Sequence, residues 1–200
     1  MLTRTLVFIK HCLEWVYFNL RSARYFEFDG KRYRYLYAFY NATWTAERKI
    51  EIPIFLDIIG KYGEGNILEV GNVLRHYVRM RHDVVDKYEV YPRVINEDIV
   101  NFKSQKKYDL IISISTLEHV GWDEAIVDSQ KPAAAITNLL GLLKLYGRLV
   151  FSFPLGYNPH LDKLIEGPQF KIAHKWILNV RAEGMTPRPL KKICIVEMKN

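Results

Sequence analysis

Three carboxylates in the middle of the chain stand at or just after short apolar runs. Glu69 lies in the run ILEVG (67–71), Asp86 ends the run DVVD (83–86), and Asp98 follows a third, shorter run. A carboxylate at such a place can accept hydrogen bonds from a ribose diol or from an adenine amino group. If the runs are parallel strands, their carboxyl ends share one edge of a sheet. We therefore predict that the three acids converge on one adenosine-containing ligand.

The first of these acids precedes a loop that suits a bound ligand. Gly71 follows the strand directly and lets the backbone approach a ligand closely, and we place Asn72 in the same binding loop. A second role for Glu69 stays open, because a buried acid there can also cap the segment that follows or pair with a lysine. Asp86 and Asp98 also remain open to a second interpretation, since aspartate is common in turns.

A second polar group follows the long apolar run at 109–114. It contains Ser115, Glu118 and His119. Imidazole accepts and releases protons near neutral pH, so His119 is the first candidate for a catalytic base. His160, which follows the apolar run at 148–153, is the second candidate. Glu118 and His119 can equally be ordinary residues of a first helical turn.

The elements that would position these residues alternate along the chain. Seven apolar segments predict strands, and helical patterns separate several of them, which indicates βαβ units and a mostly parallel sheet. The strands are expected at 66–70, 83–86, 93–95, 109–114, 148–153, within 170–180 and within 192–198. Helices are expected at 46–61, 74–80 and 124–144.

The ordered set of motifs resembles the class I S-adenosyl-L-methionine (SAM)-dependent methyltransferases. It comprises ILEVG, VVDKYE, NEDIVNF, YDLIISISTLEHV and LLKLYGRLVFSFPLGYNP, and the resemblance covers about residues 46–200. The resemblance implies an α/β fold, a Rossmann-like three-layer sandwich. Its seven-stranded, mostly parallel sheet would have an antiparallel last strand. Residues 46–200 would then form the SAM-dependent domain, and residues 1–45 an extension.

The resemblance also assigns roles to individual residues. Glu69 and Gly71 match the acid and the first glycine of the family's cofactor loop, and Asp86 matches the ribose-binding acid. The pair Asp98 and Ile99 matches the residues that contact adenine. The stretch 115–119 matches the segment that lines the methyl-transfer site, which adds Ser115, Glu118 and His119 to the predicted site.

The cofactor loop departs from the family pattern. Val73 and Arg75 stand where the second and third glycines would fall, and a side chain at Val73 would narrow the space beside the cofactor. Leu145-Tyr146-Gly147 also replaces a common Pro-Gly-Gly turn. These departures leave open a non-catalytic, methyltransferase-like binding module.

The expected reaction is methyl transfer to oxygen or nitrogen of a small molecule, sugar or glycan. Base N6-methylating enzymes carry an Asp/Asn-Pro-Pro-aromatic run where this chain has Ser-Thr-Leu-Glu-His, and cytosine C5 chemistry needs a thiolate that neither Cys12 nor Cys194 supplies. An RNA methyltransferase is a further alternative. An NAD enzyme is disfavoured because the GxGxxG motif is missing. No metal site is expected, since the cysteines have no ligand spacing.

Residues 1–45 are expected to hold a helix and an aromatic hairpin. Residues 2–20 are apolar but interrupted by Lys10, His11 and Glu14, so they favour an amphipathic helix that packs on the domain or lies on a membrane surface. Asp29-Gly30 predicts a two-residue hairpin turn. The net charge of +7 is scattered rather than clustered, which argues against nucleic acid as a partner. We expect a cytoplasmic protein of undefined oligomeric state, with or without peripheral membrane contact.

Overall fold

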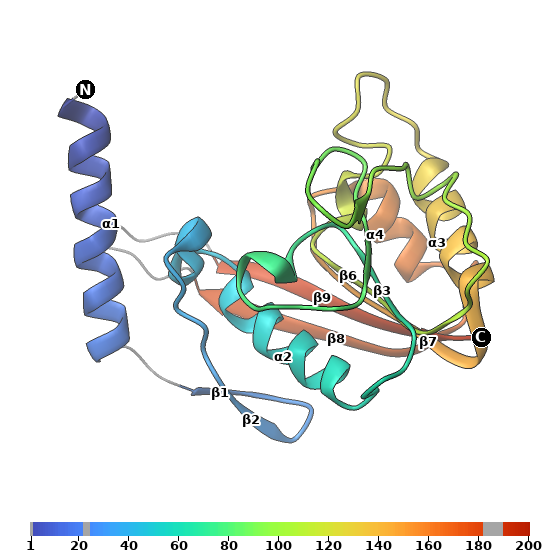
Figure 1. Cartoon of the computed structure of the whole chain (residues 1–200), viewed down its shortest axis with the longest axis horizontal. Coiled ribbons are helices and arrows are strands. Elements are labelled where there is room, and N and C mark those ends of the chain that lie inside the picture. The colour runs from blue at the N-terminus through green and yellow to red at the C-terminus, as the bar shows by residue number, and fades with distance from the viewer. Residues whose placement is uncertain (1, 22–24, 182–189) are drawn as a thin grey trace. The chain divides into compact units, whose positions relative to one another are not determined.

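The computed structural model describes residues 2–21, 25–181 and 190–200 (Figure 1). The chain divides into two compact units. One comprises Met1–Ile58 with Asn179–Lys191, and the other comprises Ile59–Leu178 with Lys192–Asn200. The boundary expected after residue 45 stays a prediction.

The first unit contains a helix and a hairpin, as the sequence predicts. Helix α1 spans Leu2–Arg21, and strands β1 (Tyr25–Phe28) and β2 (Lys31–Arg34) pair antiparallel. The turn residues Asp29 and Gly30 have φ angles of 49° and 71°. Positive φ at both central positions is what a type I′ turn requires, which explains why the Asp-Gly pair predicts the hairpin.

Trp44 anchors α1 within this unit. It lies in the 3₁₀ helix η1 (Tyr40–Thr45), is fully buried, and donates from Nε1 to the buried Glu14 carboxylate over 3.3 Å. The Phe18 ring stacks on Trp44 with centroids 6.4 Å apart, and Trp15 Nε1 donates to the Tyr37 carbonyl over 2.9 Å. Helix α2 (Arg48–Gly60) follows η1 and carries Pro53 inside it.

The second unit holds most of a seven-stranded sheet in the order β5-β4-β3-β6-β7-β9-β8. The pairs from β5 through β7 are parallel, and β9 pairs antiparallel with β7. The strands are β3 (Ile67–Val70), β4 (Asp83–Val85), β5 (Val94–Ile95), β6 (Tyr108–Ile114), β7 (Leu143–Pro154), β8 (Ile172–Arg181) and β9 (Leu190–Lys199). The predicted mostly parallel sheet with an antiparallel last strand is confirmed.

The core of this unit lies between the sheet and two helices. Helices α3 (Lys131–Leu142) and α4 (Pro159–Glu166) contact each other, and α3 contacts β7 (Figure 1). Every residue of β3 is buried, as are all but one in β6, which is why both read as nearly continuous apolar runs.

Two expected helices are shorter than predicted. The segment 74–80 forms only the 3₁₀ helix η2 (Leu74–His76), and the helix expected at 124–144 begins at Lys131 and ends at Leu142. Pro132 stands at the start of that helix rather than inside it, because its fixed φ suits a first turn. Strand β7 begins at Leu143, so it starts before the strand expected at 148–153 and includes the end of the segment that was expected to be helical.

Helix α4 was not predicted, although its sequence carries a recognisable start. The Asn158 side chain accepts hydrogen bonds from the backbone N–H groups of His160 (3.0 Å) and Leu161 (3.2 Å), and Pro159 occupies the first turn. An Asn-Pro pair before an apolar stretch is an N-terminal helix pattern. Across the described ranges, no helix combines the length and the apolar composition needed to cross a bilayer.

Candidate functional site

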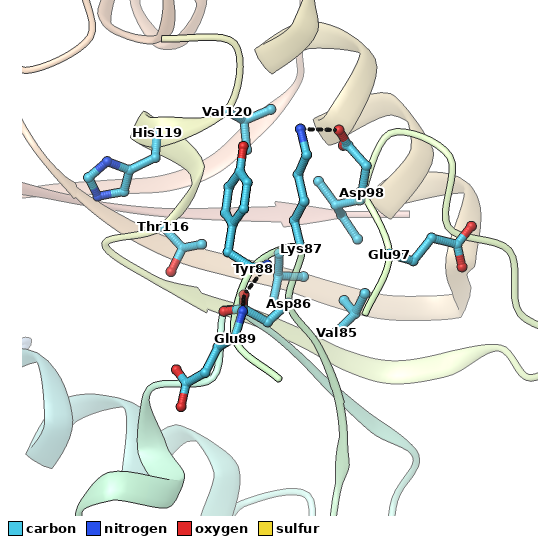
Figure 2. A pocket seen from close by; sticks show the side chains of 13 residues that line it. Val85, Asp86, Lys87, Tyr88, Glu89, Glu97, Asp98, Thr116, His119 and Val120 are labelled. Carbon is cyan, nitrogen blue, oxygen red and sulfur yellow. Dashed lines mark hydrogen bonds and ion pairs between the residues drawn. The ribbon is translucent and has the colours of Figure 1, made fainter. Parts of the chain in front are cut away.

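A cavity of about 440 Å³ opens at the carboxyl ends of β3, β4 and β6. Strand β3 pairs with β4 on one side and with β6 on the other, so this edge is the switch point where open parallel sheets bind ligands. Figure 2 shows the side chains that surround it. The lining residues are Val70, Gly71, Val85, Asp86, Lys87, Tyr88, Glu89, Glu97, Asp98, Ile99, Thr116, His119 and Val120.

Asp86 lies in the lining, at the end of β4. Its Oδ1 accepts the N–H groups of Tyr88 and Glu89, each over 2.8 Å, and its Oδ2 accepts the Asn72 N–H over 3.0 Å. Three backbone donors fix the orientation of this carboxylate. A carboxylate oxygen accepts about two hydrogen bonds, so Oδ2 retains room for a hydroxyl donor.

Gly71 also lines the cavity. It has a backbone conformation that any other residue would adopt only with strain. Its φ is +88°, and a Cβ built on it would lie 2.3 Å from Thr116 Oγ1. The Gly71 N–H donates to the Val85 carbonyl over 2.9 Å. The loop after β3 is thereby held against both β4 and the segment after β6.

Glu69 is not among the residues that line the cavity, and its carboxylate instead accepts hydrogen bonds from the backbone of the loop after β3. Its side chain is fully buried, and Oε1 accepts the N–H groups of Val73 (2.9 Å) and Leu74 (2.8 Å). Its Oε2 lies 2.7 Å from His82 Nε2. The structure therefore shows Glu69 capping the segment that follows it, which is one of the two roles that the sequence left open. Cofactor contact by Glu69 stays a prediction.

Asn72, the neighbour of Gly71, ties two acids of the site together. Besides its N–H bond to Asp86, its Nδ2 donates to Glu89 Oε1 over 2.8 Å. Its side chain is almost fully buried and does not reach the lining. Its predicted contact with the cofactor stays a prediction.

Asp98 lines the cavity within a cluster of opposite charges. Its Oδ2 lies 2.9 Å from Lys87 Nζ, drawn as a dashed line in Figure 2, and 2.7 Å from Lys131 Nζ. Glu124 pairs with the same two lysines. Burial raises the pKa of Asp98, but the hydrogen bonds from Lys131 and Lys87 outweigh it and bring the pKa to about 2. Asp98 is therefore ionised at neutral pH.

Ile99 follows Asp98 in the lining and is 5% exposed. Its carbonyl accepts from Asn138 Nδ2 over 2.7 Å. Its N–H donates to no residue in the described part of the chain. Asp98 and Ile99 therefore combine a carboxylate acceptor with an adjacent backbone donor.

The segment after β6 contributes the expected His119 and also Thr116 and Val120 to the lining, and cofactor contact by Ser115 and Glu118 stays a prediction. Ser115, with a φ of +38°, donates its N–H to the Ser152 carbonyl over 2.9 Å and lies outside the lining, whereas Thr116 lies within it. Glu118 is 1% exposed and is also outside the lining, and its carbonyl accepts from Asn158 Nδ2.

His119 stands at the cavity with its ring held by two neighbours. Its Nδ1 contacts Asp123 Oδ2, and the same oxygen accepts the Tyr157 hydroxyl over 2.6 Å. The hydrogen bonds from Tyr157 and His119 lower the pKa of the Asp123 carboxyl, and the hydrogen bond to Asp123 raises the pKa of Tyr157 to about 12. An ionised carboxylate only accepts hydrogen bonds, so the contact with Asp123 requires a proton on Nδ1. The other ring nitrogen, Nε2, lies 3.8 Å from Glu118 Oε1.

His160 lies elsewhere. It is outside the lining, and its ring contacts Trp122 with centroids 5.7 Å apart. Sequence reasoning missed the lining residues Lys87, Tyr88 and Glu89, although they directly follow Asp86. It missed Asp123 because only folding brings position 123 to position 157.

The comparisons with known proteins agree with this architecture. No family model matches the sequence, and no curated protein matches it. The N-methyltransferase NodS from Bradyrhizobium japonicum WM9, in complex with S-adenosyl-L-homocysteine, is similar in structure. Its TM-score is 0.50 at 17% identity, over 74% of this chain and 85% of that chain. A second NodS structure has the same TM-score over 93% of its chain.

The likeness to NodS is a likeness of fold, and the seven-stranded, mostly parallel sheet with its antiparallel β9 is the part of this chain that agrees with it. The chain has the class I methyltransferase fold. Magnesium protoporphyrin IX methyltransferase (ChlM) from Synechocystis PCC 6803, with bound SAM, is a more distant neighbour. Its TM-score is 0.42 at 15% identity, over 72% of this chain and 75% of that chain.

Replacing Glu69 should weaken the fold. In Glu69→Gln, an NH2 group replaces one of the two carboxylate oxygens. It cannot accept the hydrogen bonds that this oxygen accepts in the wild type. We expect a cost of about 1–3 kcal/mol, with the Tm falling by about 2–4 °C for each kcal/mol. Thermal unfolding measures this change. The exposed Glu64, replaced in the same way, is the matched control, and an unchanged Tm in Glu69→Gln would contradict the capping role.

The ion pairs of Asp98 predict a dependence of stability on pH. Because its folded pKa is depressed from 3.8 to about 2, its contribution is fully present above about pH 5 and is lost as pH falls toward 2. Asp98→Asn should therefore be less stable than wild type at pH 7, and the difference should shrink by pH 3. Urea unfolding between these pH values measures it. A difference that is independent of pH would show that the ion pairs do not stabilise the fold.

Proposed function

We propose that this chain binds SAM in the cavity and transfers its methyl group to oxygen or nitrogen of a small-molecule or glycan acceptor. One observation carries the proposal. Asp86, Gly71 and the Asp98–Ile99 pair come from the ends of three neighbouring elements and line the same cavity. Its volume falls within the range of about 300–1,000 Å³ that is usual for small-ligand sites.

Asp86 is suited to a ribose. Its carboxylate is held by three backbone N–H groups, and Oδ2 has one of its two acceptor positions unused by them. A ribose hydroxyl donating to that oxygen would meet a preoriented acceptor, so little ordering is needed on binding.

Asp98 and Ile99 are suited to adenine. The amino group of adenine donates a hydrogen bond and an adjacent ring nitrogen accepts one, and this pair supplies a carboxylate acceptor beside an available N–H. Apolar side chains of Val85, Ile99 and Val120 offer surface for a flat base. Adenosine chemistry thus fits the lining.

The charges of the cavity also fit SAM. Four carboxylates line it, and Lys87 and His119 are the basic residues of the lining. SAM bears a sulfonium and an ammonium against one carboxylate, so an acidic lining attracts it. Val73, which stands in place of a glycine, is not a lining residue and its N–H bonds to Glu69. Its side chain therefore does not narrow the cavity, which favours a functional site over a binding-dead one.

SAM supplies an electrophilic methyl group on a sulfonium sulfur. The chain then has to hold the acceptor in line and take its proton. His119 is at the cavity, and the Asp123 carboxylate keeps its Nδ1 protonated, so Nε2 is the atom that accepts a proton. Tyr157 remains a hydrogen-bond donor to Asp123 and steadies this pair. As Nε2 gains the proton, the ionised Asp123 stabilises the imidazolium.

A small-molecule or glycan acceptor agrees best with the residues present. The segment 115–119 lacks the Pro-Pro motif of base N6-methylating enzymes, and Cys194 is buried in β9 with a pKa that burial raises to about 11. A non-catalytic module remains the second candidate, because Arg75 stands where the family's loop has its third glycine. It predicts no SAM binding.

Thermal unfolding with ligands tests the cofactor. SAM and S-adenosyl-L-homocysteine at 100 times Kd should each stabilise the fold by about 2.7 kcal/mol, which corresponds to about 5–10 °C. NAD should have no effect. Calorimetry should then show that Asp86→Asn weakens SAM binding at least tenfold, while Asp83→Asn, at the opposite end of β4, leaves it unchanged. No shift with SAM, or equal affinity in Asp86→Asn, would contradict the proposal.

Single variants test the base. With a panel of sugars and small alcohols or amines as acceptors and radiolabelled SAM, His119→Asn should lower kcat by about 10²–10⁴-fold. Its SAM affinity should stay within about twofold of wild type, since the ring is proposed to act on the acceptor. Asp123→Asn should lower kcat less and should move the pH profile of kcat.

His174→Asn, a partly exposed histidine on β8, is the matched control and should retain wild-type turnover. His160→Asn distinguishes the two candidate bases. A loss of turnover in His160→Asn with normal activity in His119→Asn would reverse the assignment. A loss of SAM affinity in His119→Asn equal to the loss of kcat would make His119 a cofactor contact instead.

A further inference from the structure

Asn158 joins the start of helix α4 to the segment that carries His119. It is 1% exposed and stands at the N-cap of α4. Its Oδ1 accepts the N–H groups of His160 (3.0 Å) and Leu161 (3.2 Å), and its Nδ2 donates to the Glu118 carbonyl over 2.9 Å. Capping uses only the oxygen, so the NH2 group of this side chain does something that the helix start does not require.

The carbonyl that Asn158 contacts belongs to the peptide group between Glu118 and His119. The other side of that peptide group is also held, because the His119 N–H donates to the Thr116 carbonyl over 3.1 Å. The His119 carbonyl in turn accepts the Asp123 N–H over 3.1 Å. The bond from Asn158 therefore ties a hydrogen-bonded turn to α4, and the imidazole ring extends from that turn.

Tyr157, which precedes the cap residue, contacts the same histidine. Its hydroxyl donates to Asp123 Oδ2 over 2.6 Å, and its ring lies edge-on to the His119 ring with centroids 5.1 Å apart. The Gly156 N–H donates to Asp162 Oδ2 over 2.9 Å, which fixes the segment before the cap to α4. Two consecutive residues thus hold the backbone of His119 and the partner of its ring.

We propose that Asn158 is a positioning residue for His119, a role that rests on the proposed function of His119 as the base. Its NH2 group keeps the peptide group before His119 in place relative to Tyr157, so that the ring stays in contact with Asp123. The imidazole is then presented at the cavity in one orientation. Asn158 itself lies outside the lining, so it acts through His119 and not on the acceptor.

Two substitutions separate this role from helix capping. Asn158→Ser keeps a side-chain oxygen that can accept at the N-cap, but it is shorter and has no NH2 group to reach Glu118. Asn158→Asp keeps the length and the cap oxygen and replaces the NH2 group by an oxygen that cannot donate when ionised. Circular dichroism and thermal unfolding check that both variants fold.

The matched control is Asn66→Asp. The Asn66 Nδ2 also donates to a backbone carbonyl, that of Lys107 over 3.1 Å, but it does so at the amino end of β3, away from the cavity. This variant loses the same kind of hydrogen bond. It should keep wild-type turnover.

Hydrogen exchange followed by NMR gives a readout that needs no turnover. The N–H groups of His119 and Asp123 donate within the turn that Asn158 holds. Both should exchange at least about tenfold faster in the two Asn158 variants than in wild type or in Asn66→Asp, because the turn opens more often when its link to α4 is lost.

Turnover then tests the action through His119. With the acceptor panel and radiolabelled SAM, each Asn158 variant should lower kcat by about 10–10²-fold, since a misplacement of about 1 Å can cost about 10²-fold, and should keep SAM affinity within about twofold. In a His119→Asn background the same substitutions should change kcat by less than about twofold, because the ring that they misplace is already absent.

Three results would overturn the role of Asn158 alone. They are unchanged exchange in both variants, unchanged kcat in both variants, and a kcat that falls by the same factor with and without His119. A wild-type chain that binds SAM but transfers no methyl group to any acceptor would instead contradict the proposed function, and the role of Asn158 with it.

Discussion

Parallel pairing of β3 with both β4 and β6 is the constraint on which the site depends. The three strands run in one direction, so their carboxyl ends lie together and the loops that follow them form one cavity. Reversing any of these pairings would move an acid to the other edge of the sheet. The near-continuous apolar character of β3 and β6 supports this arrangement, because both strands are buried on both faces.

The loop after β3 satisfies the backbone N–H groups of its turn although it lacks the second and third glycines of the family's cofactor loop. A tight turn into η2 leaves backbone N–H groups without helical partners, and the buried Glu69 carboxylate accepts two of them. Within this loop, Gly71 has a positive φ and passes so close to Thr116 that a Cβ would clash with it. Glycine is therefore required at this position. Val73 lies outside the lining of the cavity, and its N–H donates to Glu69.

The charged side chains around the cavity are held in place by ion pairs and hydrogen bonds with their neighbours. Lys87 and Lys131 hold Asp98 and Glu124, and burial raises the pKa of both acids less than the lysines lower it. At the other side of the cavity, Tyr157 and His119 share one oxygen of Asp123. Each ionisable group of the proposed mechanism is thus kept in one protonation state or one orientation by a named partner. Preorganised groups of this kind reduce the reorganisation that binding and proton transfer require.

The sequence by itself determined the sheet, the hairpin and the acids at the strand ends. Apolar runs predict β3, β4 and β6 because buried parallel strands need them, and Asp29-Gly30 predicts the hairpin because its turn needs positive φ. Gly71, Asp86 and Asp98 then follow from chain order, since each comes directly after or close to a predicted strand, and the resemblance to class I methyltransferases adds Ile99. These features depend on local patterns that a single segment contains.

Only the tertiary structure decided which strand-end side chains reach the cavity. Glu69 turns inward to cap its loop, Thr116 rather than Ser115 lines the cavity, and His119 meets Tyr157 from a segment 38 positions later. Lys131 reaches Asp98 from the first turn of α3. Such contacts depend on how separate elements pack and on local φ angles, such as the positive φ of Ser115. No periodicity in one segment encodes them.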